Sequence, residues 1–223
     1  MLEISSLVFN KKGVAKEFFK TKHTKYFIFG DNDLFTLSTY PYRVGALGMT
    51  APSHFLNFSR LKIENNILVF DDKFKVENFS IYNPELKKIN FYESYRKIKT
   101  YMKNKLDNRI FRKIISNLES KNFTNIIGFG PGLTPLFDDI LSGILLLNSY
   151  YNGNVDVNFI LDVARRKTND ISYFQLRYAA EGYVPKPVKL YLEDYIKDIL
   201  LNMGDTSGIG WMLGISFFFE MEG

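Results

Sequence analysis

The stretch from Gly128 to Asp139, GFGPGLTPLFDD, contains the residue types best suited to chemistry in this sequence. Glycines at 128, 130 and 132 can adopt positive φ, which lets successive backbone N–H groups point toward a common centre. An apolar helix is expected to follow, and the amino-terminal end of a helix carries a partial positive charge. Converging N–H groups beside such an end would suit an anion such as a carboxylate or a phosphate.

Asp138 and Asp139 place two adjacent carboxylates in the otherwise apolar run LFDDILSGILLLNSY. This run predicts a buried helix over residues 135–149, with Thr134 as its N-cap and Pro135 in its first position. Buried carboxylates are costly unless they are paired, hydrogen-bonded or set against a cation or ligand. We therefore expect a purpose for at least one of them. The alternative is structural: a compact glycine turn whose aspartates bond to neighbouring backbone amides.

A second stretch with similar features lies near the carboxyl end, GDTSGIGWMLG from Gly204 to Gly214. The hydroxyls of Thr206 and Ser207 and the glycine at 208 again precede an apolar segment. If the two helices begin side by side, their N–H groups and hydroxyls could form one polar surface. A capped terminal helix with no further role is the alternative.

Several established catalytic patterns are absent. No lysine follows the first glycines, which excludes a phosphate-binding P-loop, and Leu133 stands where a dinucleotide-binding loop requires its third glycine. No serine lies in a G-x-S-x-G turn, which disfavours a Ser-His-Asp hydrolase. The sequence has no cysteine, so disulfides, thiolate metal sites and cysteine nucleophiles are excluded as well.

The elements that must position these residues change in type along the chain. Short segments rich in β-branched and aromatic residues predict strands within 25–30, 33–39, 65–72 and 73–82. Residues 40–55 carry two prolines and two glycines and are at best a strand broken by bends. From residue 91 onward apolar residues recur every three or four positions, which predicts helices within 90–106, 108–120, 155–167, 170–182 and 185–203.

This order of elements favours an α+β fold with segregated parts. We expect an N-terminal antiparallel β-rich domain over residues 1–90, built as a meander or small barrel. A C-terminal helical bundle over residues 91–223 would then carry both glycine-rich stretches.

Composition and charge limit the classes of partner. The net charge of +5 favours acidic partners such as phosphates, carboxylates or nucleic acid. The lysines are scattered, however, and the densest basic group, residues 93–114, has the apolar period of solvated helices, so nucleic acid is the weakest of the three. The start of the chain lacks the pattern of a secretory signal, and no apolar run approaches ~20 residues. We therefore expect a cytoplasmic protein without a membrane partner.

The two glycine-rich stretches, with DISYFQLRYAAEGY between them, resemble the family that includes AllH, a subunit of oxamate carbamoyltransferase from purine and allantoin breakdown. The resemblance covers roughly residues 91–220. Its first motif is Gly-x-Gly-Pro-Gly-Leu-Thr-Pro followed by Asp-Asp and a further glycine, here residues 128–135, 138–139 and 143. The chain differs from the family pattern at Leu136-Phe137, where Ser-Gly is usual, and at Gly210, where an aspartate is usual.

The resemblance implies carbamoyl transfer, or chemistry close to it, on a small carboxylate such as oxamate, with carbamoyl phosphate or phosphate as the other ligand. Such a reaction depends on anion binding and on stabilising a developing oxyanion. In this hypothesis Asp138 or Asp139 is catalytic and orients an amino group or a metal, with Mg²⁺ as the candidate cofactor. The ligand would be bound by the first stretch through Gly130, Gly132, Leu133 and Thr134, and by the second stretch through Thr206, Ser207 and Gly208.

Arg43 and His54 are the best cationic or acid–base candidates in the β-rich part, although a structural role is the alternative for each. With two histidines and no cysteine, a dedicated transition-metal site is disfavoured. The leading hypothesis is an enzyme or enzyme subunit that acts on a small anionic metabolite together with partner subunits. The competing hypothesis is a non-catalytic ligand-binding or assembly subunit of a multi-protein complex, which Leu136, Phe137 and Gly210 favour.

Overall fold

The computed structural model describes residues 2–30, 33–64 and 66–222, and its contacts divide the chain into two compact units. The first unit comprises Met1–Glu85 with Val184–Lys189, and the second comprises Leu86–Tyr183 with Leu190–Gly223. Helix α6 (Lys186–Asp194) begins in the first unit and ends in the second. Among the described residues no helix is long and apolar enough to cross a membrane.

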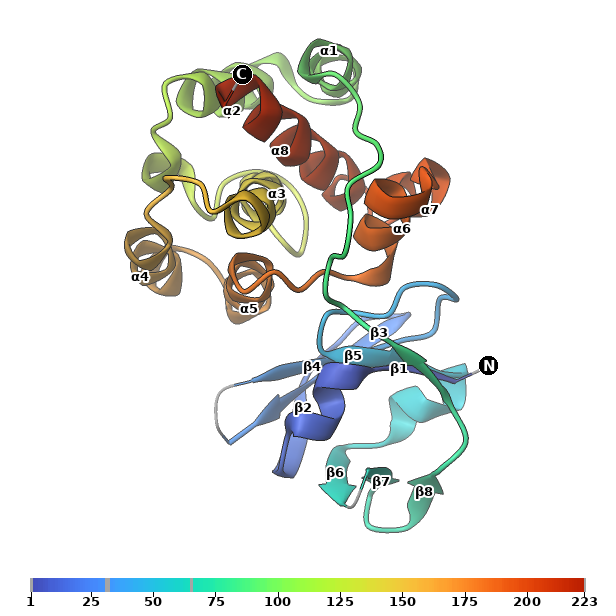
Figure 1. Cartoon of the computed structure of the whole chain (residues 1–223). Helices are drawn as coiled ribbons and strands as arrows, with labels where there is room; N and C mark the ends of the chain where they lie inside the picture. The colour runs from blue at the N-terminus through green and yellow to red at the C-terminus, as the bar shows by residue number, and fades with distance from the viewer. Residues whose placement is uncertain (1, 31–32, 65, 223) are drawn as a thin grey trace. The chain divides into compact units, whose positions relative to one another are not determined.

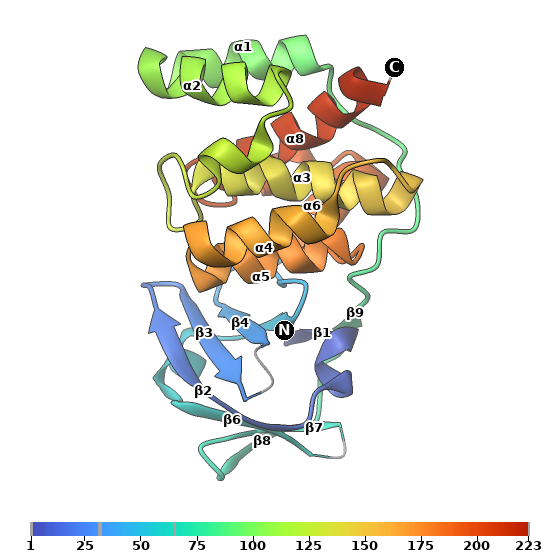
Figure 2. The same ribbon diagram turned by 90° about the vertical axis from the view of Figure 1, so that its left-hand side faces the viewer.

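The first unit is a curled sheet in the form of a half-barrel (Figures 1 and 2). Its described strands follow the order β8-β7-β6-β2-β3-β4-β5-β1-β9. Most neighbours are antiparallel, whereas the β4–β5 and β1–β9 pairs are parallel. The strands are β1 (Glu3–Ser5), β2 (Gly13–Lys20), β3 (Thr24–Phe29), β4 (Leu34–Ser38), β5 (Gly48–Thr50), β6 (Arg60–Glu64), β7 (Ile67–Phe70), β8 (Phe74–Val76) and β9 (Ser80–Tyr82). Short 3-10 helices, η1 (Ser6–Asn10) and η2 (Ser53–Asn57), join some of them.

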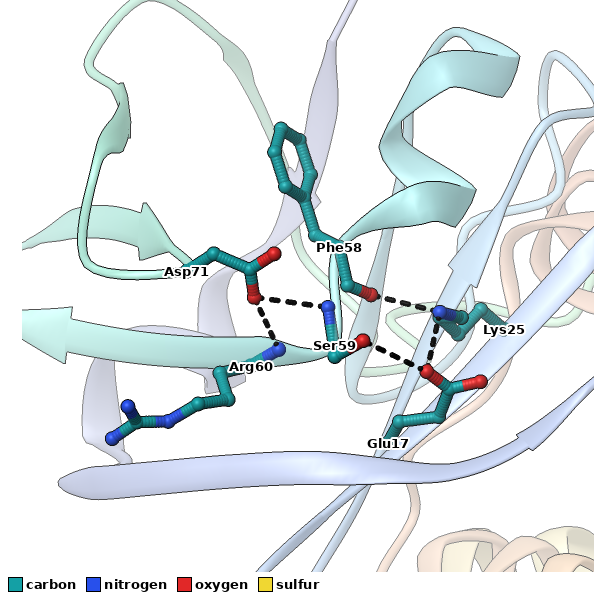
Figure 3. A network of polar contacts seen from close by, with 6 residues as sticks. All are labelled: Glu17, Lys25, Phe58, Ser59, Arg60 and Asp71. Carbon is teal, nitrogen blue, oxygen red and sulfur yellow. Dashed lines mark hydrogen bonds and ion pairs between the residues drawn. The ribbon is translucent and has the colours of Figure 1, made fainter.

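An ion pair between the buried Lys25 and the exposed Glu17 anchors the end of η2 to the sheet (Figure 3). The ammonium of Lys25 on β3 is almost fully buried and donates to Glu17 Oε2 and to the Phe58 carbonyl, each at 2.8 Å. Asp71 Oδ1 accepts the neighbouring backbone amides of Ser59 and Arg60 at 2.9 and 2.8 Å. The polar groups around this chain crossing are therefore satisfied where the strand β6 begins.

The strands expected from sequence are present, and three further strands were not identified. β1 has only three residues, and β2 exposes five consecutive residues from Lys16 to Lys20. β6 does alternate charged and apolar residues, but over only five positions. The interrupted segment 40–55 contributes only the short β5 and the start of η2. Gly48 is required in β5 because a Cβ there would lie 2.2 Å from the carbonyl oxygen of Thr36.

The second unit is helical and is arranged around α3 (Leu136–Tyr151), which is packed against α8 (Ser207–Glu222) and α5 (Asp170–Ala180) (Figures 1 and 2). Nearly every residue of α3 up to Asn148 is buried. The other elements of this unit are α1 (Tyr95–Lys105), α2 (Asn108–Glu119), η3 (Phe123–Ile126), α4 (Val157–Lys167) and α7 (Lys197–Leu201). The single helical pattern over 185–203 is divided into α6 and α7, because Tyr195 adopts a left-handed φ of 58°.

Glycines let α3 and α8 approach each other closely. A Cβ at Gly214 would lie 1.9 Å from the carbonyl oxygen of Ile140, and one at Gly143 would lie 2.7 Å from that of Trp211. Both glycines are therefore needed for packing. Gly143, which follows the aspartate pair by one helical turn, faces a helix rather than a ligand.

Candidate functional site

The first loop, residues 127–135, has the left-handed conformation that its glycines allow. Gly128, Gly130 and Gly132 have φ values of 80°, 110° and 116°. A Cβ at Gly128 would lie 2.3 Å from the carbonyl oxygen of Lys167, so this position requires glycine for space as well as for conformation. Pro131, Gly132 and Leu133 are exposed at the loop surface.

The start of α3 differs from the sequence prediction. The helix begins at Leu136 with Pro135 as its N-cap, so the assignment of Thr134 as the N-cap was wrong. The amides of Leu136 and Phe137 donate instead to the carbonyls of Pro131 and Phe129, at 3.2 and 3.0 Å. Because loop carbonyls satisfy these first-turn donors, the Thr134 side chain is free to bond elsewhere.

Asp138 holds the first loop in place. It is fully buried, and its Oδ1 accepts the backbone N–H of Gly128 at 2.8 Å. Its Oδ2 accepts the hydroxyl of Thr168, which follows α4. Burial raises the pKa of Asp138, while the bonds from Thr168 and Gly128 oppose the rise. The carboxylate therefore links the first loop, α3 and the end of α4. Its bond to the Gly128 amide is the kind of contact expected if the aspartates only stabilise the glycine turn.

Asp139 has a different set of partners. Its Oδ1 accepts the side-chain amide of Gln175 on α5 at 2.8 Å, and its Oδ2 accepts the hydroxyl of Thr134 at 3.2 Å. The side chain has no exposed surface. Burial raises its pKa from 3.8 to about 7, against the lowering effect of Gln175, Ser207 and Thr134. Asp139 can therefore donate or accept a proton near neutral pH.

The two glycine-rich stretches contact each other through hydroxyl groups. Thr134 Oγ1 lies 3.1 Å from Ser207 Oγ at the start of α8. The hydroxyl of Thr206 donates to the carbonyl of Pro131 at 3.4 Å. The second loop, residues 202–206, therefore lies beside the first, and Asp139 lies next to the junction.

Some backbone amides of the first loop remain available to a ligand. Within the part of the chain that the structure describes, the N–H groups of Gly130, Gly132 and Leu133 donate to no protein acceptor. Gly208 differs, because it is buried and its amide donates to the carbonyl of Met203 at 3.1 Å. A Cβ at Gly208 would lie 1.8 Å from the carbonyl oxygen of Leu200. Glycine is therefore needed here for close packing of the start of α8 against Leu200.

Leu136, Phe137 and Gly210, which differ from the pattern that the resemblance implies, lie in tightly packed surroundings. Leu136 and Phe137 are both fully buried. A Cβ at Gly210 would lie 2.7 Å from Asp139 Cβ and 3.0 Å from Leu136 Cδ1, so this backbone arrangement has no room for an aspartate there.

Arg43 and His54 belong to the first compact unit. The guanidinium of Arg43 lies 4.1 Å from the centre of the Tyr40 ring, and burial lowers the pKa of Arg43. The ring of His54, in η2, lies 4.8 Å from that of Phe55. Both residues therefore contact aromatic rings, which agrees with a structural role. A ligand-binding role for either residue stays a prediction.

Three residues of the site were not identified from sequence: Ser142, Thr168 and Gln175. Ser142 donates to the carbonyl of Asp138 at 2.8 Å and accepts from Gln175 at 3.0 Å. Its spacing of four residues from Asp138 is a local signal for the first of these bonds. Gln175 is separated from Asp139 by 36 positions, and no local pattern singles it out.

The carboxylate pair is already engaged in hydrogen bonds within the protein. All four of its oxygens already accept a hydrogen bond from the protein. Within residues 2–30, 33–64 and 66–222 no three histidine, aspartate or glutamate side chains are grouped so that they could hold a metal ion. Magnesium binding by Asp138 or Asp139 together with a substrate phosphate stays a prediction.

The part of the chain that carries this site matches a known family. Residues 126–219 match the family model for the oxamate carbamoyltransferase subunit AllH. The resemblance expected from sequence is confirmed for this segment. It contains both loops together with α3, α4, α5 and α8. No solved structure matches the chain.

Proposed function

We propose that the chain is a subunit of a carbamoyltransferase-like enzyme and that its two loops bind a small carboxylate or phosphate compound. The observation that carries the proposal is the contact between Thr134 and Ser207, which joins both loops beside the buried Asp139. The match to the oxamate carbamoyltransferase subunit supports the reaction class. The proposal extends that match to a binding site.

The available donors suit an anionic ligand. The amides of Gly130, Gly132 and Leu133 have no acceptor in the described part of the chain, and the last two residues are exposed. Backbone amides in a loop of left-handed glycines form a concave arrangement that favours carboxylate or phosphate oxygens. The hydroxyl of Ser207, which is hydrogen-bonded to Thr134, adds a further group that can donate to the same ligand.

Asp139 supplies the acid–base function in this proposal. Carbamoyl transfer between an amino group and phosphate requires a proton to leave or join the nitrogen. A carboxyl with a pKa of about 7 exchanges a proton near neutral pH with little energetic cost. Asp138 is assigned a structural role, because its oxygens hold Gly128 and Thr168.

The test is direct binding by titration calorimetry with inorganic phosphate, carbamoyl phosphate and oxamate. Thr134→Ala should weaken binding about tenfold, an effect of ~1.4 kcal/mol, because it removes the hydrogen bond that orients the Ser207 hydroxyl beside the ligand. Thr100→Ala is the matched control, because Thr100 is exposed on α1 and its hydroxyl bonds to its own helix at the Arg96 carbonyl. If the unmodified protein binds none of the three compounds, the proposal is wrong.

The second candidate is a non-catalytic binding or assembly subunit, which the buried apolar Leu136 and Phe137 favour. It predicts anion binding without any dependence of carbamoyl transfer on Asp139. The discriminating experiment measures transfer by the chain together with its partner subunits, using the unmodified protein and Asp139→Asn. A loss of transfer with retained anion binding supports the catalytic role, and unchanged transfer supports the second candidate.

A further inference from the structure

We propose that Gln175, Asp139, Thr134 and Ser207 form a hydrogen-bonded relay in which Gln175 directs the proton of Asp139 toward the two loops. The relay carries that proton between the buried carboxyl and a ligand bound at Ser207. This inference rests on the proposed function of the loops. It adds Gln175 as a positioning residue and gives the two hydroxyls a defined task.

The orientation of the Gln175 amide follows from its neighbour Ser142. The single hydroxyl proton of Ser142 is donated to the carbonyl of Asp138 at 2.8 Å. Ser142 Oγ can therefore only accept from Gln175, and the group that faces it at 3.0 Å must be the NH₂. The other N–H of the same NH₂ group donates to Asp139 Oδ1 at 2.8 Å.

This amide decides which oxygen of Asp139 carries the proton. Oδ1 faces an N–H donor, so a proton on Oδ1 would disrupt that hydrogen bond. The proton of neutral Asp139 therefore lies on Oδ2, which is 3.2 Å from Thr134 Oγ1. Thr134 in turn lies 3.1 Å from Ser207 Oγ, either of which can donate to the other.

The two hydroxyls reverse direction with the protonation of Asp139. When Asp139 is neutral, Oδ2 donates to Thr134, Thr134 donates to Ser207, and the Ser207 proton is left to donate to a ligand. When Asp139 is ionised, Ser207 donates to Thr134 and Thr134 donates to Oδ2, so Ser207 can only accept from a ligand. In the transfer Asp139 Oδ2 gives its proton to Thr134, Thr134 gives its own to Ser207, and Ser207 gives its own to the ligand. Each hydroxyl therefore loses one O–H bond and forms another, Asp139 ends ionised, and the ligand ends protonated.

Burial and charge support a proton exchange at this carboxyl. Asp139 has no exposed surface, while Thr134 and Ser207 are half-buried and lie beside exposed loop residues. In the described part of the chain, Asp138 is the titratable neighbour whose charge acts on Asp139. The partners from α5, α8 and the first loop are the neutral Gln175, Ser207 and Thr134. The hydroxyl chain is thus the polar connection from the buried carboxyl to the loops.

The first experiment needs no ligand and follows the titration of Asp139 by carbon-13 NMR of labelled aspartate side chains. Gln175→Met and Thr134→Val each remove a donor to the ionised carboxyl and should raise its pKa by about one unit. Thr134→Ser keeps the hydroxyl and should leave the titration unchanged. If neither Gln175→Met nor Thr134→Val changes the pKa of Asp139, the relay is wrong. If Gln175→Met does not fold, the result for Thr134→Val alone decides whether the relay is correct.

The second experiment uses oxamate, whose carboxylate keeps its charge between pH 6 and 8. The affinity of the unmodified protein and of Thr134→Ser should fall about tenfold across this range, because ionised Asp139 repels the anion and turns Ser207 into an acceptor. Thr134→Val should bind with a smaller pH dependence, about threefold or less, because Ser207 is uncoupled. An equal pH dependence in all three proteins overturns the relay and leaves anion binding intact. Failure to bind oxamate, phosphate or carbamoyl phosphate rejects the proposed function, whereas the NMR titration still tests the relay.

Discussion

Replacing Asp139 by asparagine should stabilise the protein at alkaline pH. Asparagine reproduces the bonding of the neutral carboxyl, because its oxygen can accept from Gln175 and its NH₂ can donate to Thr134. It removes the ability to ionise in a site that has no exposed surface. The variant therefore isolates the free energy of placing a charge there.

The size of the effect follows from the pKa of Asp139, which rises from 3.8 to about 7 on folding. Each unit corresponds to about 1.4 kcal/mol, so full ionisation costs the folded protein ~4 kcal/mol. Because the pKa of Asp139 is higher in the folded than in the unfolded protein, the carboxyl contributes its full stabilisation below the unfolded value of 3.8. This contribution to the free energy of unfolding is lost as pH rises through about 7. The free energy of unfolding of Asp139→Asn should therefore exceed that of the unmodified protein. The difference should grow by ~3 kcal/mol between pH 5 and pH 8.

Urea unfolding at pH 5 and pH 8 provides the measurement, with the fluorescence of the single tryptophan, Trp211, as the probe. This side chain is buried on α8 and should report on the helical unit. Asp156→Asn at the exposed N-cap of α4 is the matched control, because asparagine caps a helix about as well as aspartate. An advantage of Asp139→Asn that is the same at both pH values would refute the assignment of a buried, readily protonated carboxyl.

Three further substitutions and one control test the packing, the first loop and the ion pair. Gly214→Ala should destabilise the protein by about 1–3 kcal/mol or more in urea unfolding, because its Cβ would lie 1.9 Å from the Ile140 carbonyl oxygen. Gly30→Ala is the control. Apart from its neighbours in the chain, no atom of the described residues lies within 4 Å of a Cβ there, so the free energy of unfolding should change little. Gly128→Ala should destabilise by a similar amount and also weaken anion binding, since it displaces the first loop; retained affinity would separate that loop from the site. Lys25→Met should cost about 1–2 kcal/mol at pH 7 through its lost hydrogen bonds. Lys25 lowers the pKa of Glu17, so this cost should shrink as pH falls through the lowered value, and a cost that is constant down to pH 3 would contradict the ion pair.

Much of the fold could be predicted because its signals are local. The apolar period locates α2, α4 and α5 to within two residues of their observed ends, and the change from strands to helices gives the α+β class. The strands β1 and β2 lack a regular apolar period, and β6 alternates over only five residues. Their conformation is imposed by pairing with neighbours elsewhere in the sheet, including the parallel β4–β5 and β1–β9 pairs that no local turn specifies.

The candidate site divides in the same way. The sequence by itself determined that residues 128–135 would be a glycine loop leading into a buried helix, because only glycine tolerates those left-handed conformations. It also determined that the cost of burying two adjacent carboxylates had to be offset. Their separate tasks followed only from the tertiary structure. Asp138 is hydrogen-bonded to Thr168 and Asp139 to Gln175, residues that are 30 and 36 positions apart in the sequence. Thr134 and Ser207, which are also hydrogen-bonded, are 73 positions apart. Contacts at such separations depend on how α3, α5 and α8 pack, and no local sequence pattern specifies that packing.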